Sequence, residues 1–177
     1  MSASDDFDGA ADLTEHFRRR LASDQQTLAT SWKANQPLLD QLKILNNLSS
    51  KNLLRTSGFE ILVTQVQSGG VVGGKTPIYQ SPVVGVNINF NALKKGKSSL
   101  EISLGVDGQY TLTYGGMLGG KVVETTSRNK VNNALNTWLA DLGQSNGLNV
   151  IDAMLKRQRD VAERQVAASQ KTERAPK

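Results

Sequence analysis

Residues 59–126 contain four short segments in which apolar and polar side chains alternate and a fifth segment, KVVETT, that also reads as a strand, and this pattern constrains the fold more than any other feature. The clearest segment is VVGVNINFN (residues 83–91), where every second residue is valine, isoleucine or phenylalanine. A period of two places successive side chains on opposite faces of a β-strand. Asp107-Gly108, between the third and fourth segments, is a strong two-residue hairpin turn. The sequence therefore predicts a mostly antiparallel five-stranded meander with one apolar and one small, polar face.

Helical periodicity precedes the alternating region. Residues 12–34 place leucine, phenylalanine and tryptophan on one narrow stripe, and a second run of leucines at helical spacing follows Pro37. Because proline interrupts a helix, we expect the first helix to end just before Pro37 and a second helix to begin there.

Helical periodicity also follows the alternating region. Ser127 is a good N-cap and Gly143 a good C-terminal stop for a helix whose apolar stripe would cover the sheet. A last helix is expected from about Leu148, ending in a charged tail rich in alanine and glutamine.

The predicted fold class is α+β: an antiparallel five-stranded meander sheet with a helix packed on one face, and helical N- and C-terminal extensions. The predicted organisation has three parts, which are a helical N-terminal extension (1–50), a sheet-plus-helix core domain (51–145) and a basic C-terminal helix with a flexible tail (146–177).

The composition argues against several classes of function. The chain has no cysteine and one histidine, His16, so disulfides, cysteine nucleophiles, a Ser-His-Asp triad and a histidine-rich metal site are not expected. We predict no enzymatic activity, no cofactor and no metal. No run of about 18 apolar residues suggests a membrane span, and the acidic N-terminus lacks the apolar core of a secretory signal. Together with the absence of cysteine, these features favour a cytoplasmic protein.

Two glycine-rich stretches resemble phosphate-binding loops in spacing. SGGVVGGKTP (residues 68–77) has the glycine, lysine and threonine positions of a P-loop, and YGGMLGGKVV (residues 114–123) repeats them without the hydroxyl. A P-loop requires a helix directly after it, whereas Pro77 and the residues that follow predict a strand. Both stretches are therefore predicted to be hairpin connections tipped by Lys75 and Lys121, with glycines that allow close approach of a partner.

A third loop concentrates positive charge. In NALKKGKSSLEIS (residues 91–103), Lys94, Lys95 and Lys97 flank a glycine and lead into a strand. Such a compact group of ammonium ions suits contact with phosphates, and a solubilising charged turn is the alternative interpretation.

The charge is also distributed unevenly along the whole chain. Residues 1–50 hold five Lys or Arg and seven Asp or Glu, residues 51–126 hold seven and four, and residues 127–177 hold nine and five. An acidic N-terminal part followed by a basic body and tail suits a polyanionic partner, although charge also serves solubility.

The lysine loop carries a resemblance to a known family. KGKSSLEIS (residues 95–103) resembles the lysine-glycine-lysine motif that opens a strand in the Whirly family of single-stranded nucleic-acid binders. PC4-like domains are similar in plan, with a curved antiparallel sheet and a following helix. The resemblance rests on Lys95, Gly96, Lys97 and Leu100, and it implies a binder of single-stranded RNA or DNA.

Two hypotheses follow for the function. The first is a non-enzymatic single-stranded nucleic-acid (RNA or DNA) binding protein, with lysine-rich loops on phosphates and the small polar sheet face on bases or sugars. Tyr110 and Tyr114 are in phase with Leu112 and are predicted to face the core, which counts against an aromatic stacking platform. The predicted nucleic-acid-binding residues are Lys94, Lys95, Lys97, Lys75, Lys121, Asn87, Asn89, Arg128 and Lys130.

The alternative hypothesis is a self-assembling structural or adaptor protein. Its terminal helices each have a narrow apolar seam, and its sheet has two edges that can pair with another chain. Under either hypothesis the protein is predicted to form homo-oligomers and not to contact a membrane.

Overall fold

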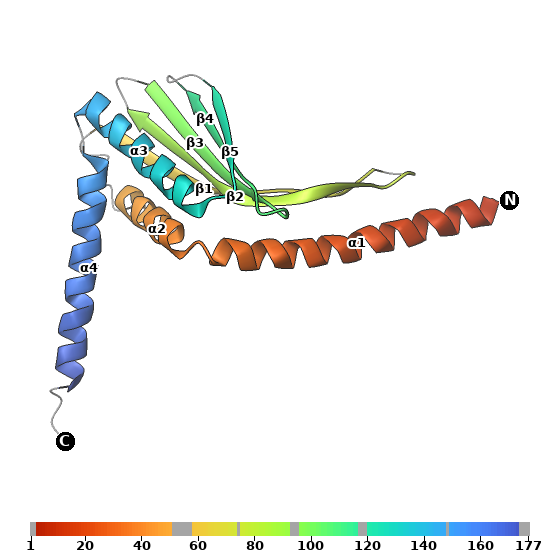
Figure 1. The fold of residues 1–177 in the computed structure, drawn as a ribbon, viewed down its shortest axis with the longest axis horizontal. Helices are drawn as coiled ribbons and strands as arrows, with labels where there is room; N and C mark the ends of the chain where they lie inside the picture. Colours follow the sequence, from red (N-terminus) through yellow and green to blue (C-terminus); the bar gives the residue numbers. More distant parts are fainter. Residues whose placement is uncertain are drawn as a thin grey trace.

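The computed structural model confirms the predicted α+β fold, with one five-stranded antiparallel sheet of order β1-β2-β3-β4-β5 and helices at both ends (Figure 1). The described residues are 3–50, 58–73, 75–92, 96–116, 120–147 and 149–173. Within them, the helices are α1 (Ala3–Lys33), α2 (Gln36–Ser50), α3 (Arg128–Asn146) and α4 (Val150–Glu173). The strands are β1 (Phe59–Val72), β2 (Ile78–Ala92), β3 (Gly96–Gly105), β4 (Tyr110–Gly116) and β5 (Lys121–Thr125).

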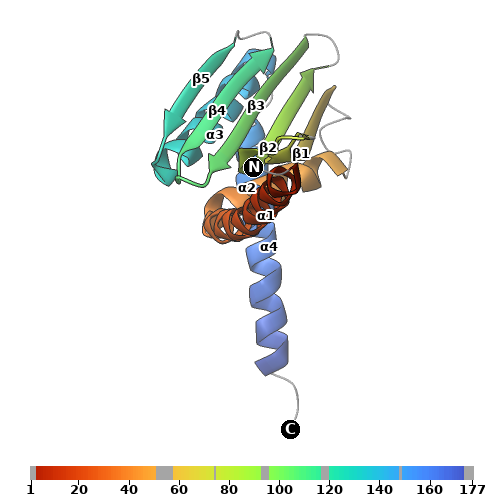
Figure 2. The ribbon, with the colours of Figure 1, turned by 90° about the vertical axis from the view of Figure 1, so that its right-hand side faces the viewer.

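The helices lie on one side of the sheet, and the other face of the sheet is uncovered (Figures 1 and 2). Figure 2 looks onto this uncovered face, with α3 behind the strands and α4 projecting away from the sheet. The strands β2 to β5 pair without a register shift. Alternate residues along each of these strands therefore face the helices, and the residues between them face the uncovered side of the sheet.

The core lies between the sheet and helices α2 and α3. Ile88, Leu100 and Ile102 of the sheet are fully buried, as are Leu135 and Leu139 of α3. Each buried leucine or isoleucine contributes about 1.5–3 kcal/mol to folding through removal of apolar surface from water. The leucines of α2 belong to the same core, so the N-terminal segment contributes directly to the stability of the sheet domain.

The connection between α1 and α2 is also anchored in the core. Asn35 is buried, donates a hydrogen bond to the carbonyl oxygen of Ser31, and accepts one from the hydroxyl of Tyr110 over 2.7 Å. The predicted break between the two helices before Pro37 is confirmed. At this break the buried side chain of Asn35 is hydrogen-bonded to Tyr110 of β4.

The predicted ends of two helices are wrong. The first helix begins at Ala3 rather than near residue 12. The sequence did not predict this start, because the acidic N-terminal residues lack an apolar stripe at helical spacing. The sheet-covering helix does not stop at Gly143, which is buried within α3, but continues to Asn146. Gly147 adopts the left-handed conformation with φ of 72°, and its N–H bonds to the carbonyl oxygens of Gly143 and Gln144. The N-cap at Ser127 is confirmed, since its side chain accepts from the backbone N–H of Lys130.

β1 and β2 are longer than the other strands and extend beyond them as a two-stranded arm. Residues 78–82 of β2 lie past the last residue paired with β3, and the arm runs alongside α1 (Figure 1). Tyr79 joins the arm to α1: its ring lies 5.6 Å from that of Phe17, and the guanidinium of Arg20 lies 4.4 Å from its centroid. Its hydroxyl donates a hydrogen bond to Asp24.

The environment of Tyr79 predicts a specific dependence of stability on pH. Burial and the hydrogen bond to Asp24 raise the pKa of Tyr79 from 10.0 to about 12. The folded state thus holds the phenol proton more tightly than the unfolded chain, so this stabilisation is complete below pH 10 and is lost between about pH 10 and pH 12. We expect Tyr79→Phe to remove the latest-titrating phenol from an ultraviolet absorbance titration, and to flatten the fall in unfolding free energy above pH 10. An unchanged titration in the variant would contradict the assignment.

Candidate nucleic-acid interface

The outward side chains of the sheet belong to the face that has no helix over it in Figure 2, which we call the uncovered face. Each of these residues alternates with a residue that points into the core, and pairing aligns them in rows across the strands. Most of them are small and polar, as the sequence predicts. The uncovered face consists of Glu60, Leu62, Thr64, Asn87, Asn89, Asn91, Lys97, Ser99, Glu101, Ser103, Thr111, Thr113, Val122 and Glu124.

Side-chain hydrogen bonds order the centre of the uncovered face. The amide of Asn89 donates to Asn87 over 3.0 Å, and the amide of Asn87 donates to Glu101 over 3.3 Å. This chain of bonds fixes Asn87 in orientation, while Asn89 is exposed and retains its carbonyl oxygen and a second N–H for a ligand. An oriented amide of this kind can recognise the edge of a base or a sugar hydroxyl.

The predicted cations divide between the two ends of the sheet. Lys97 is the second residue of β3 and Lys121 is the first residue of β5, and both are exposed at the end where β2 joins β3 and β4 joins β5. We call this the loop end. Lys97 is in phase with the uncovered face, whereas Lys121 is opposite Tyr114 and in phase with the covered one. Lys94 and Lys95 lie outside the described residues.

The remaining predicted cations do not join this group. Lys75 is exposed near the tip of the β1–β2 arm, and Arg128 and Lys130 are exposed in the first turn of α3, which follows the opposite end of β5. The meander causes this separation, because successive antiparallel connections lie at alternate ends of the sheet. The predicted set of nine residues is therefore not a single site.

Acidic residues limit where an anion can bind. Glu60, Glu101 and Glu124 all belong to the uncovered face, but they lie in three different rows. The carboxylate of Glu101 accepts from Asn87, and that of Glu124 accepts from Gln109 over 3.1 Å. Glu60 shares the row of Asn91 and Lys97 but is two strands away from Lys97, so a phosphate at the loop end is attracted most strongly beside Lys97 itself.

The two tyrosines of β4 face the core, as predicted. Tyr110 is buried, and half-buried Tyr114 packs against the core cluster, where burial raises its pKa. The uncovered face, as defined above, therefore contains no aromatic ring. The first glycine-rich stretch, residues 68–77, is a hairpin connection, as predicted, because Ile78 begins a strand where a P-loop would require a helix.

A cleft beside β1 was not anticipated from the sequence. It has a volume of about 360 Å³, lies between the end of α1, α2 and the first two strands, and contains Trp32, Lys43 and Gln65. The sequence placed Trp32 on the apolar stripe of a helix, which is correct but does not show that its ring borders a cavity. No local signal could identify the cleft, because its walls come from four separate elements.

In the described part of the chain, no group of three or more His, Cys, Asp or Glu residues is placed to hold a metal ion. Within the same residues, none of the helices has the length and apolar character needed to cross a membrane. Comparisons of the chain with protein-family models, curated proteins and solved structures find no match.

Proposed function

We propose that this protein binds single-stranded RNA or DNA without catalysis, along the uncovered face and with phosphates held at the loop end. The observation that carries the proposal is the position of a broad, uncovered sheet surface with small polar side chains directly beside exposed Lys97. Small side chains let a nucleic-acid strand approach the sheet closely, and the exposed, oriented amide of Asn89 offers hydrogen bonds to it.

The absence of aromatic rings from the defined uncovered face sets the character of the proposed binding. Without base stacking on the sheet, phosphate contacts supply most of the affinity, which makes binding strongly dependent on salt and tolerant of sequence. The arrangement of a sheet followed by α3 is in keeping with the plan that the resemblance to Whirly and PC4-like domains implies. We further propose a cytoplasmic location, which the lack of cysteine favours.

A single added charge on the uncovered face tests the proposal. Asn89 is exposed and two residues from Asn91, the register partner of Lys97. We expect Asn89→Glu to weaken binding of a labelled single-stranded oligonucleotide about fivefold or more at 0.1 M salt, because it repels the phosphates near Lys97. Fluorescence anisotropy at several salt concentrations measures the change.

The matched control adds the same charge far from the sheet. Gln165 is exposed on α4, so Gln165→Glu should leave the affinity close to that of the parent protein. Equal losses in the two variants would indicate attraction by net charge alone. Failure of the parent protein to bind the oligonucleotide at low salt would contradict the proposed function.

Self-assembly through the terminal helices is a second candidate function. The observation that favours it is the apolar side chains exposed along α4, which projects from the body of the protein (Figure 1). Leu155 is 48% exposed and Val166 is 56% exposed, so association with another helix would remove apolar surface from water.

A further inference from the structure

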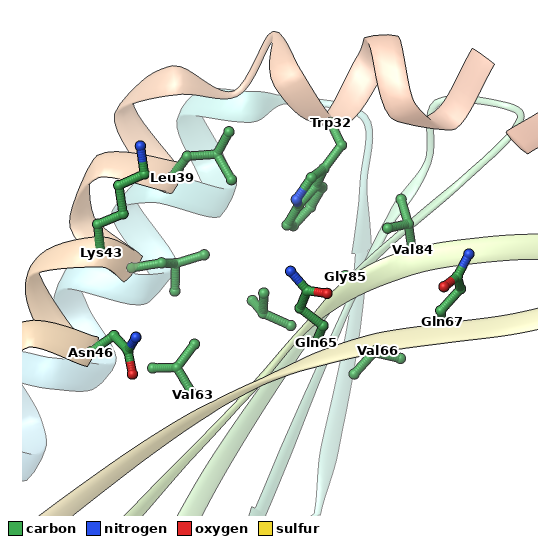
Figure 3. Close-up of a pocket in the computed structure, with 12 residues that line it drawn as sticks. Trp32, Leu39, Lys43, Asn46, Val63, Gln65, Val66, Gln67, Val84 and Gly85 are labelled. Carbon is green, nitrogen blue, oxygen red and sulfur yellow. The ribbon is translucent and has the colours of Figure 1, made fainter. Parts of the chain in front are cut away.

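The cleft beside β1 combines an apolar floor with a polar rim. Aliphatic side chains that include Val84 supply the apolar surface, and Gln65 on β1 lies below Trp32, opposite Lys43 and Asn46 of α2, while Gln67 lies farther along β1 beside Val84 (Figure 3). Its volume of about 360 Å³ is within the range of about 300–1,000 Å³ typical of small-molecule sites. A few polar groups above an apolar floor are what such sites use to orient a ligand.

The wall of the cleft is an aromatic ring. Trp32, near the C-terminal end of α1, projects into the cavity with its ring above Gln65 (Figure 3). It is half-buried, in contrast to Trp138 of α3, which is only 3% exposed within the core. A tryptophan that is held by the core on one side and borders a cavity on the other presents a fixed surface on which a flat ring can stack.

Within the described residues, the polar side chains of the rim have no side-chain partner. Lys43, Asn46, Gln65 and Gln67 make no hydrogen bond or ion pair to another described side chain. The two glutamines and the asparagine each provide both donors and an acceptor, and Lys43 adds one cation at the opening. Amides of this kind match the mixed donor and acceptor edge of a nucleobase, and the ammonium matches the phosphate attached to it.

We propose that this cleft binds one nucleobase, stacked on Trp32 and hydrogen-bonded by the glutamines of β1, with its phosphate beside Lys43. The inference rests on the proposed function in taking nucleic acid as the ligand class, and it supplies the aromatic contact that the uncovered face lacks. The base can belong to a free nucleotide or to a strand that continues onto the sheet, and the two sources are separated by the measurement below.

Trp32 fluorescence tests the proposal directly. Because Trp138 is buried, quenching on addition of nucleosides, nucleoside monophosphates or an oligonucleotide should come from Trp32. The Trp32→Phe variant retains only Trp138, so any fall in its fluorescence measures the light that the ligand itself absorbs. We expect saturable quenching in the parent protein and none in this variant.

Two further substitutions separate stacking from charge. Trp32→Leu, which removes the ring, should weaken oligonucleotide binding about tenfold, whereas Trp32→Phe, which keeps a smaller ring, should recover part of the loss. Lys43→Ala should weaken binding of a nucleoside monophosphate about fivefold at 0.1 M salt and leave binding of the uncharged nucleoside unchanged. Equal affinities of the Leu and Phe variants for the oligonucleotide would overturn the stacking role.

The outcomes for the two proposed sites are distinct. Oligonucleotide binding without quenching of Trp32 overturns the nucleobase cleft and leaves the function of the uncovered face standing. Quenching by nucleoside monophosphates without any oligonucleotide binding supports the cleft as a site for free nucleotides and overturns the function of the uncovered face. Quenching by both supports a strand that runs from the cleft onto the sheet.

Discussion

Replacement of Lys94, Lys95 and Lys97 by alanine is expected to lower the affinity for single-stranded oligonucleotides roughly 100-fold at 0.1 M salt. Each phosphate contact on a single strand contributes about 0.7 to the slope of log K against log salt, which corresponds to about fivefold at 0.1 M. If all three contacts exist, the slope should also become shallower by about two units. The loss should be similar for all sequences, because phosphate contacts carry no base information.

A cluster of equal charge on α4 provides the control for this experiment. Neutralisation of Lys156, Arg157 and Arg159 should have a much smaller effect, because α4 projects away from the uncovered face (Figure 2). Arginine at the three loop positions should be tolerated, and glutamate should be more damaging than alanine. An unchanged affinity and salt slope in a folded triple-alanine variant would remove the loop from the binding site.

Gly85→Ala is expected to destabilise the fold by about 3 kcal/mol, the upper end of the cost of overpacking. A Cβ atom at this position would lie 2.0 Å from the carbonyl oxygen of Ile102 and 2.7 Å from the Cα atom of Ser103. Gly85 does not have a positive φ, so the cost comes from the close approach of β3 rather than from the backbone conformation of β2. Since the obstructing atoms are backbone, the strands must separate to accommodate the methyl group.

Gly120→Ala is the matched control for Gly85→Ala. No heavy atom lies within 4 Å of a Cβ atom at Gly120, and its φ is not positive, so the change should stay within about 0.5 kcal/mol. Thermal unfolding monitored by circular dichroism should show a fall in Tm of about 6–12 °C for Gly85→Ala and little change for Gly120→Ala. Equal Tm values for the two variants would contradict the close approach of β2 and β3.

The strands could be predicted from the sequence because their signal is local. Along residues 83–91 the alternation of apolar and polar side chains specifies a half-buried strand. Asp107-Gly108 marks the turn between antiparallel β3 and β4, but the predicted two-residue loop is wrong, because residues 106–109 separate the strands and the N–H of Gly105 bonds to the carbonyl oxygen of Gln109 over 3.0 Å. The position of Tyr110 in the core followed from the same phase. The end of α3 could not be placed in this way, because Gly143 and Gly147 are both plausible caps and only the observed left-handed conformation of Gly147 distinguishes them.

For the candidate sites, too, the features with a local sequence signal could be predicted and the others could not. Asn87 and Asn89 could be assigned to one polar face from their spacing alone, since a period of two relates neighbours along a strand. The separation of Lys75 from Lys97, by contrast, depends on which connections lie at which end of the sheet. The sequence by itself determined the α+β class, the meander and the two chemically different faces, because these depend on residues a few positions apart. Only the tertiary structure decided that one face has no helix over it and that Trp32 meets Gln65 in a cleft, because both depend on how distant segments pack.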